Sequence, residues 1–358
     1  GSRGGDPLPP VTTAEPRQPS RTLWHNPTMP TAHRVRFGTG LIESLEFDPE
    51  RSAFVTMELP WALVTPRLRS RPAHVEFVHS MERTVLDQTA ETLPPTDIVI
   101  GLGGGSALDF AKYLAWKRDL RLILIPSIVS VDACVTGAIG VRDQGRVHYV
   151  GQVKPELLLV DFNLIREAPP RLNRAGAGDI LSIHTGSFDW LLGHKKDGER
   201  YDRQVARRAA DLLEDLQRSA AEIAKVTDNG IRALVELFQA ENDLCEGFGN
   251  SRPEEGSEHF FAYNAELRTG KQFVHGEIVC LGILLMSRLQ GNRPDWVMAL
   301  LEDLGVRYRP AEIGLEPGEL RDSLSTLPEF CRQERLPYTI ISETLDDTSA
   351  IDALMSDL

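Results

Sequence analysis

The first half of the chain contains short apolar runs that stand between polar or glycine-rich stretches. Apolar residues at successive positions are typical of strands that are buried on both faces of a parallel sheet. Apolar residues at helical spacing predict a helix from Ser106 to Trp116, between two of these runs. Strands that alternate with helices indicate an α/β domain with a helix-covered sheet. The predicted strands are Val35–Gly38, Ala53–Met57, Val75–Val78, Asp97–Gly101, Arg121–Pro126 and Leu157–Asp161.

The second half has a different pattern, which begins after the chain-breaking stretch Ala168–Pro170. Apolar residues there recur at helical spacing, with few of the alternations that indicate strands. We therefore expect an α/β domain at residues 31–165 and an all-helical domain at residues 166–358. Residues 1–30 are rich in Pro, Gly, Arg, Ser and Thr, and are predicted to form a disordered tail. Helices are predicted over residues 203–226, 228–246, 276–290 and 294–304.

Composition narrows the classes of function. With 358 residues, of which 41% are hydrophobic, the chain is long enough for two packed cores. A net charge of -13 argues against a nucleic-acid partner, because no basic stripe exists to displace counterions from phosphates. The chain has no apolar run near the roughly 20 residues of a membrane span, and its N-terminus lacks a signal-peptide pattern. Four isolated cysteines indicate reduced thiols, and we expect a cytoplasmic protein that binds a small molecule.

A glycine-rich segment, Gly101–Ser106, follows a predicted strand and opens a predicted helix. Backbone N–H groups at such a turn can face a pyrophosphate without obstruction by Cβ atoms, so we interpret it as a phosphate site of a Rossmann-like domain. A plain strand-to-helix turn is the alternative. Glu58, at the end of a predicted strand, could bind an adenosine ribose, which favours NAD over NADP, or could be a solvated loop acid.

Three side chains far apart in the sequence form a candidate metal site: Asp179, His259 and His275. Taken singly, Asp179 could be a helix N-cap, and the histidines could be ordinary core or surface residues. Together they supply three oxygen and nitrogen ligands and leave room on a divalent ion for substrate oxygen, which is typical of a catalytic site. A metal-assisted redox enzyme with its substrate in a cleft between two domains is the resulting hypothesis.

Several separate motifs at compatible spacing carry a family resemblance. The chain resembles the iron-containing alcohol dehydrogenase and dehydroquinate synthase superfamily, and within it the sn-glycerol-1-phosphate dehydrogenase and glycerol dehydrogenase branch. The likeness covers roughly residues 34–342. It implies the dehydroquinate synthase-like two-domain fold, an α/β Rossmann-like N-terminal domain plus an all-helical metal-binding domain. The motifs are Gly103–Lys112, Ala168–Ile180, Phe188–Leu192, Gly256–His259, His275–Glu277 and Tyr338–Ile341.

The resemblance also implies roles for individual residues. Asp179, His259 and His275 would bind zinc or iron, or nickel as in some members, and Asp132 would lie beside the nicotinamide and the substrate. Asp109 belongs to the same glycine-rich motif, where a helix-packing or surface role is the alternative. The implied reaction is NAD- or NADP-linked reduction of glycerone phosphate to sn-glycerol 1-phosphate. The implied cofactor contacts are Gly103, Gly104, Gly105, Ser106, Ser127 and Ser130.

The loop Pro126–Gly137 differs from the pattern of glycerol-1-phosphate dehydrogenases, so another small polyol, ketone or phosphorylated substrate stays open. A sugar-phosphate cyclase that uses NAD transiently is a second hypothesis, although such enzymes have Glu where this chain has Asp179 and Lys where it has Ser182. A catalytically silent homologue is a third, and a homo-oligomer is also open. A phosphorylated substrate needs a cation in the cleft. The candidates that sequence does not rank are Arg142, Lys154, Arg252 and Lys271.

Overall fold

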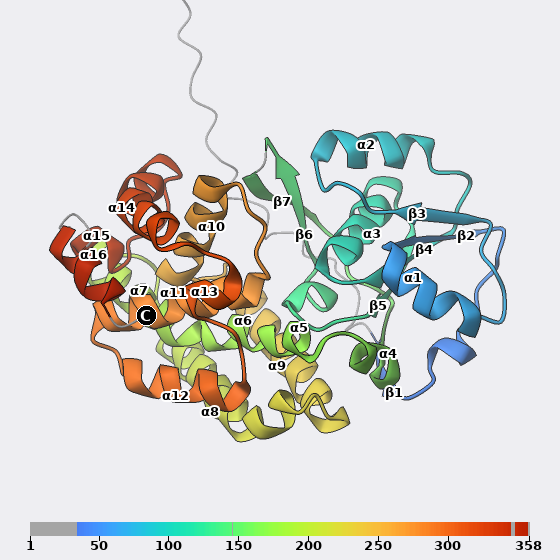
Figure 1. The fold of residues 1–358 in the computed structure, drawn as a ribbon. Coiled ribbons are helices and arrows are strands. Elements are labelled where there is room, and N and C mark those ends of the chain that lie inside the picture. Colours follow the sequence, from blue (N-terminus) through green and yellow to red (C-terminus); the bar gives the residue numbers. More distant parts are fainter. Residues whose placement is uncertain (1–33, 145, 345–347, 357–358) are drawn as a thin grey trace, which may run out of the picture. The chain divides into compact units, whose positions relative to one another are not determined.

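The computed structural model describes residues 34–144, 146–344 and 348–356, and the predicted tail at residues 1–30 lies outside them. Its first half is built on a six-stranded parallel sheet with the strand order β1-β8-β5-β4-β2-β3 (Figure 1). All six predicted strands are present. They are β1 (Arg34–Gly38), β2 (Ser52–Thr56), β3 (His74–Phe77), β4 (Ile98–Gly103), β5 (Arg121–Pro126) and β8 (Leu157–Asp161).

Both faces of the sheet are covered, which is why its strands are apolar at successive positions. Successive side chains of a strand point to opposite faces. Phe54, Ile100 and Ile123 accordingly belong to one apolar cluster, while Val99 and Leu124 belong to another that continues into the helical half. The connecting elements of this half are η1 (Ile42–Ser44), α1 (Glu58–Val64), η2 (Thr65–Arg67), α2 (Arg83–Thr92), α3 (Gly105–Arg118) and η3 (Asp132–Cys134).

An antiparallel hairpin, β6 (Ala138–Asp143) and β7 (Arg146–Gln152), was not predicted from the sequence. Most of β7 is exposed, so its residues lack a clear apolar alternation. Lys112 of helix α3 is fully buried and its Nζ donates to the carbonyl oxygens of Thr136 and Ala138, at 3.2 and 2.7 Å. A buried cation therefore joins the hairpin to the helix that follows the glycine-rich turn.

The described residues after 161 form helices and no strand, which confirms the predicted all-helical half (Figure 1). No helix among the described residues is both long and apolar enough to cross a membrane. All four cysteines are free. The helices are α4 (Phe162–Glu167), α5 (Pro170–Ala175), α6 (Ala177–Leu181), α7 (Ile183–Asp197), α8 (Arg203–Ala224), α9 (Asp228–Phe248), α10 (Ser257–Thr269), α11 (His275–Gln290), α12 (Pro294–Leu304), α13 (Pro310–Ile313), α14 (Pro317–Gln333), α15 (Ile341–Thr344) and α16 (Thr348–Met355).

Candidate metal centre and adjoining cavity

The glycine-rich turn joins strand β4 to helix α3. Gly103 has φ +152°, and a Cβ at this position would lie 2.7 Å from the Cβ of Ala107. A Cβ on Gly104 would lie 2.8 Å from Ile128 Cδ1, the end of a side chain that can shift, so the requirement for glycine is strict only at Gly103. No side chain caps the N-terminus of α3. Its first N–H groups are thus available to an anion, which is the geometry of a phosphate site.

The other predicted cofactor residues differ in whether they line the cavity beside this turn. The Ser127 N–H donates to the Gly103 carbonyl at 2.9 Å, and Ser127 and Ser130 are both buried. Asp109 lines the cavity described below and forms an ion pair with Lys112, with Oδ1 and Nζ 2.6 Å apart. Glu58 is the exposed first residue of α1 and does not line that cavity, nor do Ser127 and Ser130.

The three predicted metal ligands come together although they are far apart in the sequence. Asp179 lies in α6, His259 in the first turn of α10, and His275 is the first residue of α11. One ligand atom from each lies within 4.8 Å of the others. Asp179 Oδ1 is 3.6 Å from His275 Nε2, is buried, and accepts no hydrogen bond from the described residues. A buried oxygen without a donor beside two imidazoles fits a cation ligand.

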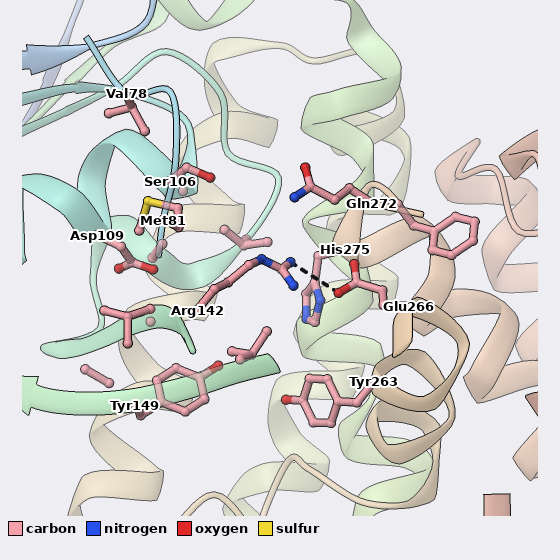
Figure 2. A pocket seen from close by; sticks show the side chains of 18 of the residues that line it. Val78, Met81, Ser106, Asp109, Arg142, Tyr149, Tyr263, Glu266, Gln272 and His275 are labelled. Atoms are coloured by element: carbon pink, nitrogen blue, oxygen red, sulfur yellow. Dashed lines mark hydrogen bonds and ion pairs between the residues drawn. The ribbon is translucent and has the colours of Figure 1, made fainter. Parts of the chain in front are cut away.

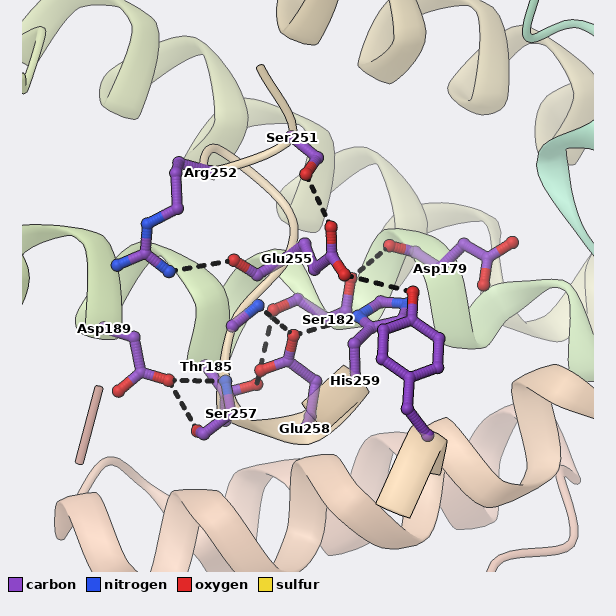
Figure 3. Close-up of polar contacts among 12 residues, drawn as sticks. Asp179, Ser182, Thr185, Asp189, Ser251, Arg252, Glu255, Ser257, Glu258 and His259 are labelled. Atoms are coloured by element: carbon purple, nitrogen blue, oxygen red, sulfur yellow. Dashed lines mark hydrogen bonds and ion pairs between the residues drawn. The ribbon is translucent and has the colours of Figure 1, made fainter. Parts of the chain in front are cut away.

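Glu258 orients the imidazole of His259 (Figure 3). His259 Nδ1–H donates to Glu258 Oε1 at 3.0 Å, which leaves Nε2 to face the candidate metal position. Glu258 is fully buried and its other oxygen, Oε2, accepts from the Thr185 hydroxyl at 2.7 Å. Asp189 accepts from the Ser257 N–H at 2.9 Å and from the Ile340 N–H at 2.8 Å, which holds the start of α10 in place.

Burial and neighbouring charges shift the pKa values of the candidate metal ligands and of Asp132. Burial raises the pKa of Asp179 to about 6, against the opposing effect of His259. Burial and the neighbouring Asp179 raise the pKa of Asp132 to about 7. Burial lowers the pKa of His259, but its hydrogen bond to Glu258 and nearby carboxylates outweigh burial and raise it to about 9. Burial and the charge of His259 lower the pKa of His275 to about 4. A cation bound among these groups would favour ionised carboxylates and neutral imidazoles.

Asp132 lies next to the metal centre. Its N–H donates to Asp179 Oδ2 at 3.1 Å, so the backbone of η3 fixes one ligand oxygen. Asp132 also lines a cavity of about 520 Å³, and His275 lines the same cavity. Gly105 and Ser106 line the same cavity (Figure 2). The phosphate-type turn and the metal centre therefore open into one space, lined by residues of both predicted domains.

Sequence reasoning missed several residues of this site. Tyr149, Tyr263 and Glu266 line the cavity, and Glu258 holds His259. Tyr263 and Glu266 lie one and two helical turns after His259 on α10, so helical spacing from a proposed ligand could have indicated them. Tyr149 belongs to the hairpin that was not predicted, and no local signal pointed to it.

The fold is similar to that of solved dehydrogenases and reductases. A glycerol dehydrogenase from Schizosaccharomyces pombe superposes with a TM-score of 0.65 at 18% identity, covering 90% of this chain and 88% of that chain. A sulfoacetaldehyde reductase from Bifidobacterium kashiwanohense in complex with NAD+ superposes with a TM-score of 0.66 at 17% identity, covering 92% and 100%. These similarities establish the two-domain fold.

Sequence comparison identifies the family. The iron-containing alcohol dehydrogenase profile matches residues 56–169. A glycerol-1-phosphate dehydrogenase of Hyperthermus butylicus, named as using NAD(P)+, is 32% identical over 328 residues, which are 87% of this chain and 92% of that relative. The same enzyme of Aeropyrum pernix is 32% identical over 285 residues, or 79% of this chain and 78% of that relative. The chain belongs to the iron-containing alcohol dehydrogenase family.

Proposed function

We propose that the protein is a metal-dependent, NAD(P)-linked dehydrogenase that interconverts glycerone phosphate and sn-glycerol 1-phosphate. The observation that carries this proposal is the convergence of Asp179, His259 and His275 in the wall of a cavity that also contains Gly105 and Ser106. The names of the relatives from Hyperthermus butylicus and Aeropyrum pernix support the substrate. Such an enzyme transfers hydride between a nicotinamide and a carbon atom of the substrate.

The donor set fits a divalent metal ion, zinc, iron or nickel. Asp179 offers a buried oxygen without a hydrogen-bond donor, and Glu258 holds the imidazole of His259 with one nitrogen facing the site. When bound, the ion would supply Lewis-acid chemistry to the substrate oxygen. Asp179, His259 and His275 would hold it.

The remaining roles concern the cofactor and the substrate. Gly103, Gly104, Gly105 and Ser106 would bind the pyrophosphate at the start of α3, and Asp109 lines the cavity beside them. Ser127, Ser130 and Glu58 stay predicted cofactor contacts that do not line this cavity. Asp132 would orient the substrate hydroxyl, since it lies in the cavity wall and its N–H is fixed on Asp179. A domain boundary near residue 165, a homo-oligomeric state and a cytoplasmic location are further parts of the proposal, the last supported by four free cysteines.

The direct test is an assay at 340 nm with zinc-, iron- or nickel-loaded protein. Glycerone phosphate should oxidise NADH or NADPH stoichiometrically, and sn-glycerol 1-phosphate should reverse the reaction while sn-glycerol 3-phosphate does not. Turnover without a net change in nicotinamide absorbance would instead indicate a cyclase. A protein that holds no metal at about one ion per chain and has no turnover would support a silent homologue.

A further inference from the structure

The cavity beside the metal centre has one strong cation in its wall. Among the described residues that line the cavity of about 520 Å³, Arg142 is the only Lys or Arg. Figure 2 shows its side chain extending from strand β6 toward His275. A guanidinium in this position faces the space where a substrate bound at the metal centre would lie.

The position of this guanidinium is well defined. The Arg142 N–H donates to the Met81 carbonyl at 2.8 Å, and the Arg142 side chain is about a quarter exposed. One guanidinium nitrogen, Nη2, lies 3.3 Å from Glu266 Oε2. Glu266 is two helical turns after His259 on α10, a rise of roughly 10 Å along the helix. The charged end of Arg142 is thus held in the wall of the cavity that His275 also lines.

The structure also distinguishes among the four side chains that the sequence offered as candidates for binding a substrate phosphate. Lys154 pairs with Glu246 at 2.6 Å, and Lys271 pairs with Glu319 at 2.6 Å. Arg252 is buried against Glu199, with Nε and Oε1 2.8 Å apart. None of these three lines the cavity, whereas Arg142 does.

A second, smaller cavity of about 270 Å³ shares part of this wall. Arg142, Tyr149, Tyr263 and Glu266 line both cavities. The ion pair of Arg142 and Glu266 therefore stands where the two spaces adjoin. The smaller cavity provides room for a charged group beyond the reacting carbon.

We propose that Arg142 binds the phosphate group of the substrate and makes the enzyme specific for phosphorylated ketones, which rests on the proposed dehydrogenase function. The planar guanidinium has five N–H donors and pairs with phosphate in a bidentate way. Glu266 holds Arg142 in the free enzyme and competes with the incoming phosphate for it. The carbonyl end of the substrate then faces Asp179, His259 and His275.

The test compares Arg142→Gln, Arg142→Lys and Glu266→Gln with a matched control, Arg268→Gln. Arg268 lies on α10 and pairs with Asp322, and it lines neither cavity. In metal-loaded protein, R142Q should lower kcat/KM for glycerone phosphate roughly 100-fold, mainly through KM, because charge-assisted hydrogen bonds to the phosphate are lost. R142K keeps the positive charge but loses the planar, bidentate guanidinium, so its loss of kcat/KM for glycerone phosphate should be intermediate. E266Q should leave KM unchanged or lower it, and R268Q should match the wild type.

Three further measurements decide what the cation serves. The KM values for NADH and NADPH should be unchanged in R142Q, and so should kcat/KM for unphosphorylated glycerone. A selective loss of NADPH would assign Arg142 to the cofactor's 2′-phosphate and overturn the proposal. Equal kcat/KM of R142Q and wild type for glycerone phosphate would overturn it as well.

The proposal can also be separated from the proposed function. Binding of inorganic phosphate to the metal-loaded protein, measured by calorimetry, should be present in the wild type and lost in R142Q. If the wild type fails to reduce glycerone phosphate, the proposed function is wrong, while this phosphate binding would still support Arg142 as the anion site. Retained NADH fluorescence and an unchanged unfolding temperature in R142K establish that the variant is folded.

Discussion

At the scale of single residues, the carboxylate of Glu258 determines how well the site holds an ion. It accepts from His259 Nδ1 at 3.0 Å and from the Gly256 N–H at 2.6 Å. Both contacts are made to Oε1, so Glu258→Gln can keep the shape and these two contacts, but it removes the negative charge behind the imidazole. We expect zinc affinity to fall about 10- to 100-fold, as for other groups that orient a metal-bound imidazole.

A zinc titration against a competing chelator measures this loss. The matched control is Asp161→Asn, since Asp161 is a buried carboxylate that accepts from the Ile42 and Asn163 N–H groups and, among the described residues, belongs to no group of possible metal ligands. D161N should bind zinc as the wild type does. Equal zinc affinity of E258Q and wild type would show that Glu258 does not orient His259.

Lys112 gives a second prediction at this scale, on stability. It is fully buried and its Nζ contacts Asp109 at 2.6 Å, besides two carbonyl oxygens. Lys112→Met leaves the carboxylate without its cation, so we expect the free energy of unfolding to fall by about 3–5 kcal/mol. Lys117→Met, on the same helix, removes a partly exposed pair with Asp87 and should cost about 1 kcal/mol or less. Urea denaturation compares the two, and equal losses would contradict the buried role of Lys112.

At the scale of elements, close packing of α11 on α5 sets the position of His275. A Cβ on Gly276 would overlap the carbonyl oxygen of Ala175, which belongs to the backbone and cannot move aside cheaply. Gly276→Ala should therefore displace the start of α11, weaken zinc binding at least 10-fold, and lower the free energy of unfolding by about 1–3 kcal/mol.

Gly247 provides the matched control. It lies inside helix α9 and nothing is within 4 Å of a Cβ built on it. Gly247→Ala should leave zinc binding unchanged and stabilise the protein by up to about 1 kcal/mol, because alanine restricts the unfolded chain and favours the helix. If G276A and G247A behave alike in calorimetry and zinc titration, helix packing does not determine the ligand geometry.

Elements also show how much of the fold could be predicted from the sequence. Strand β5 and helix α12 have the predicted bounds, because apolar periodicity reports local burial. The hairpin β6–β7 was missed, since most of β7 is exposed and the hairpin is held by a buried lysine of α3. A contact made by a residue so distant in the chain leaves no periodic pattern in the hairpin itself.

At the scale of the whole molecule, an ion bound by three helices should stabilise the folded state. A ligand that binds only the folded protein adds about 2.7 kcal/mol of stability at 100 times its Kd. Zinc should therefore raise the unfolding temperature and a chelator should lower it again. His275→Ala should abolish this shift while NADH binding persists, whereas His194→Ala, at the end of α7, should keep it. A zinc-induced shift that survives in H275A would place the ion elsewhere.

The sequence by itself determined the local features: the parallel strands, the helical second half, the glycine-rich turn and the residue types suited to bind a metal. Each of these depends on neighbours in the chain, through backbone preferences and apolar spacing. Only the tertiary structure decided which side chains meet. It brought Asp179, His259 and His275 together, put Glu258 behind the imidazole, and chose Arg142 among four cations. These choices depend on how distant helices and a hairpin pack, and the packing energy is shared among many residues that no short segment contains.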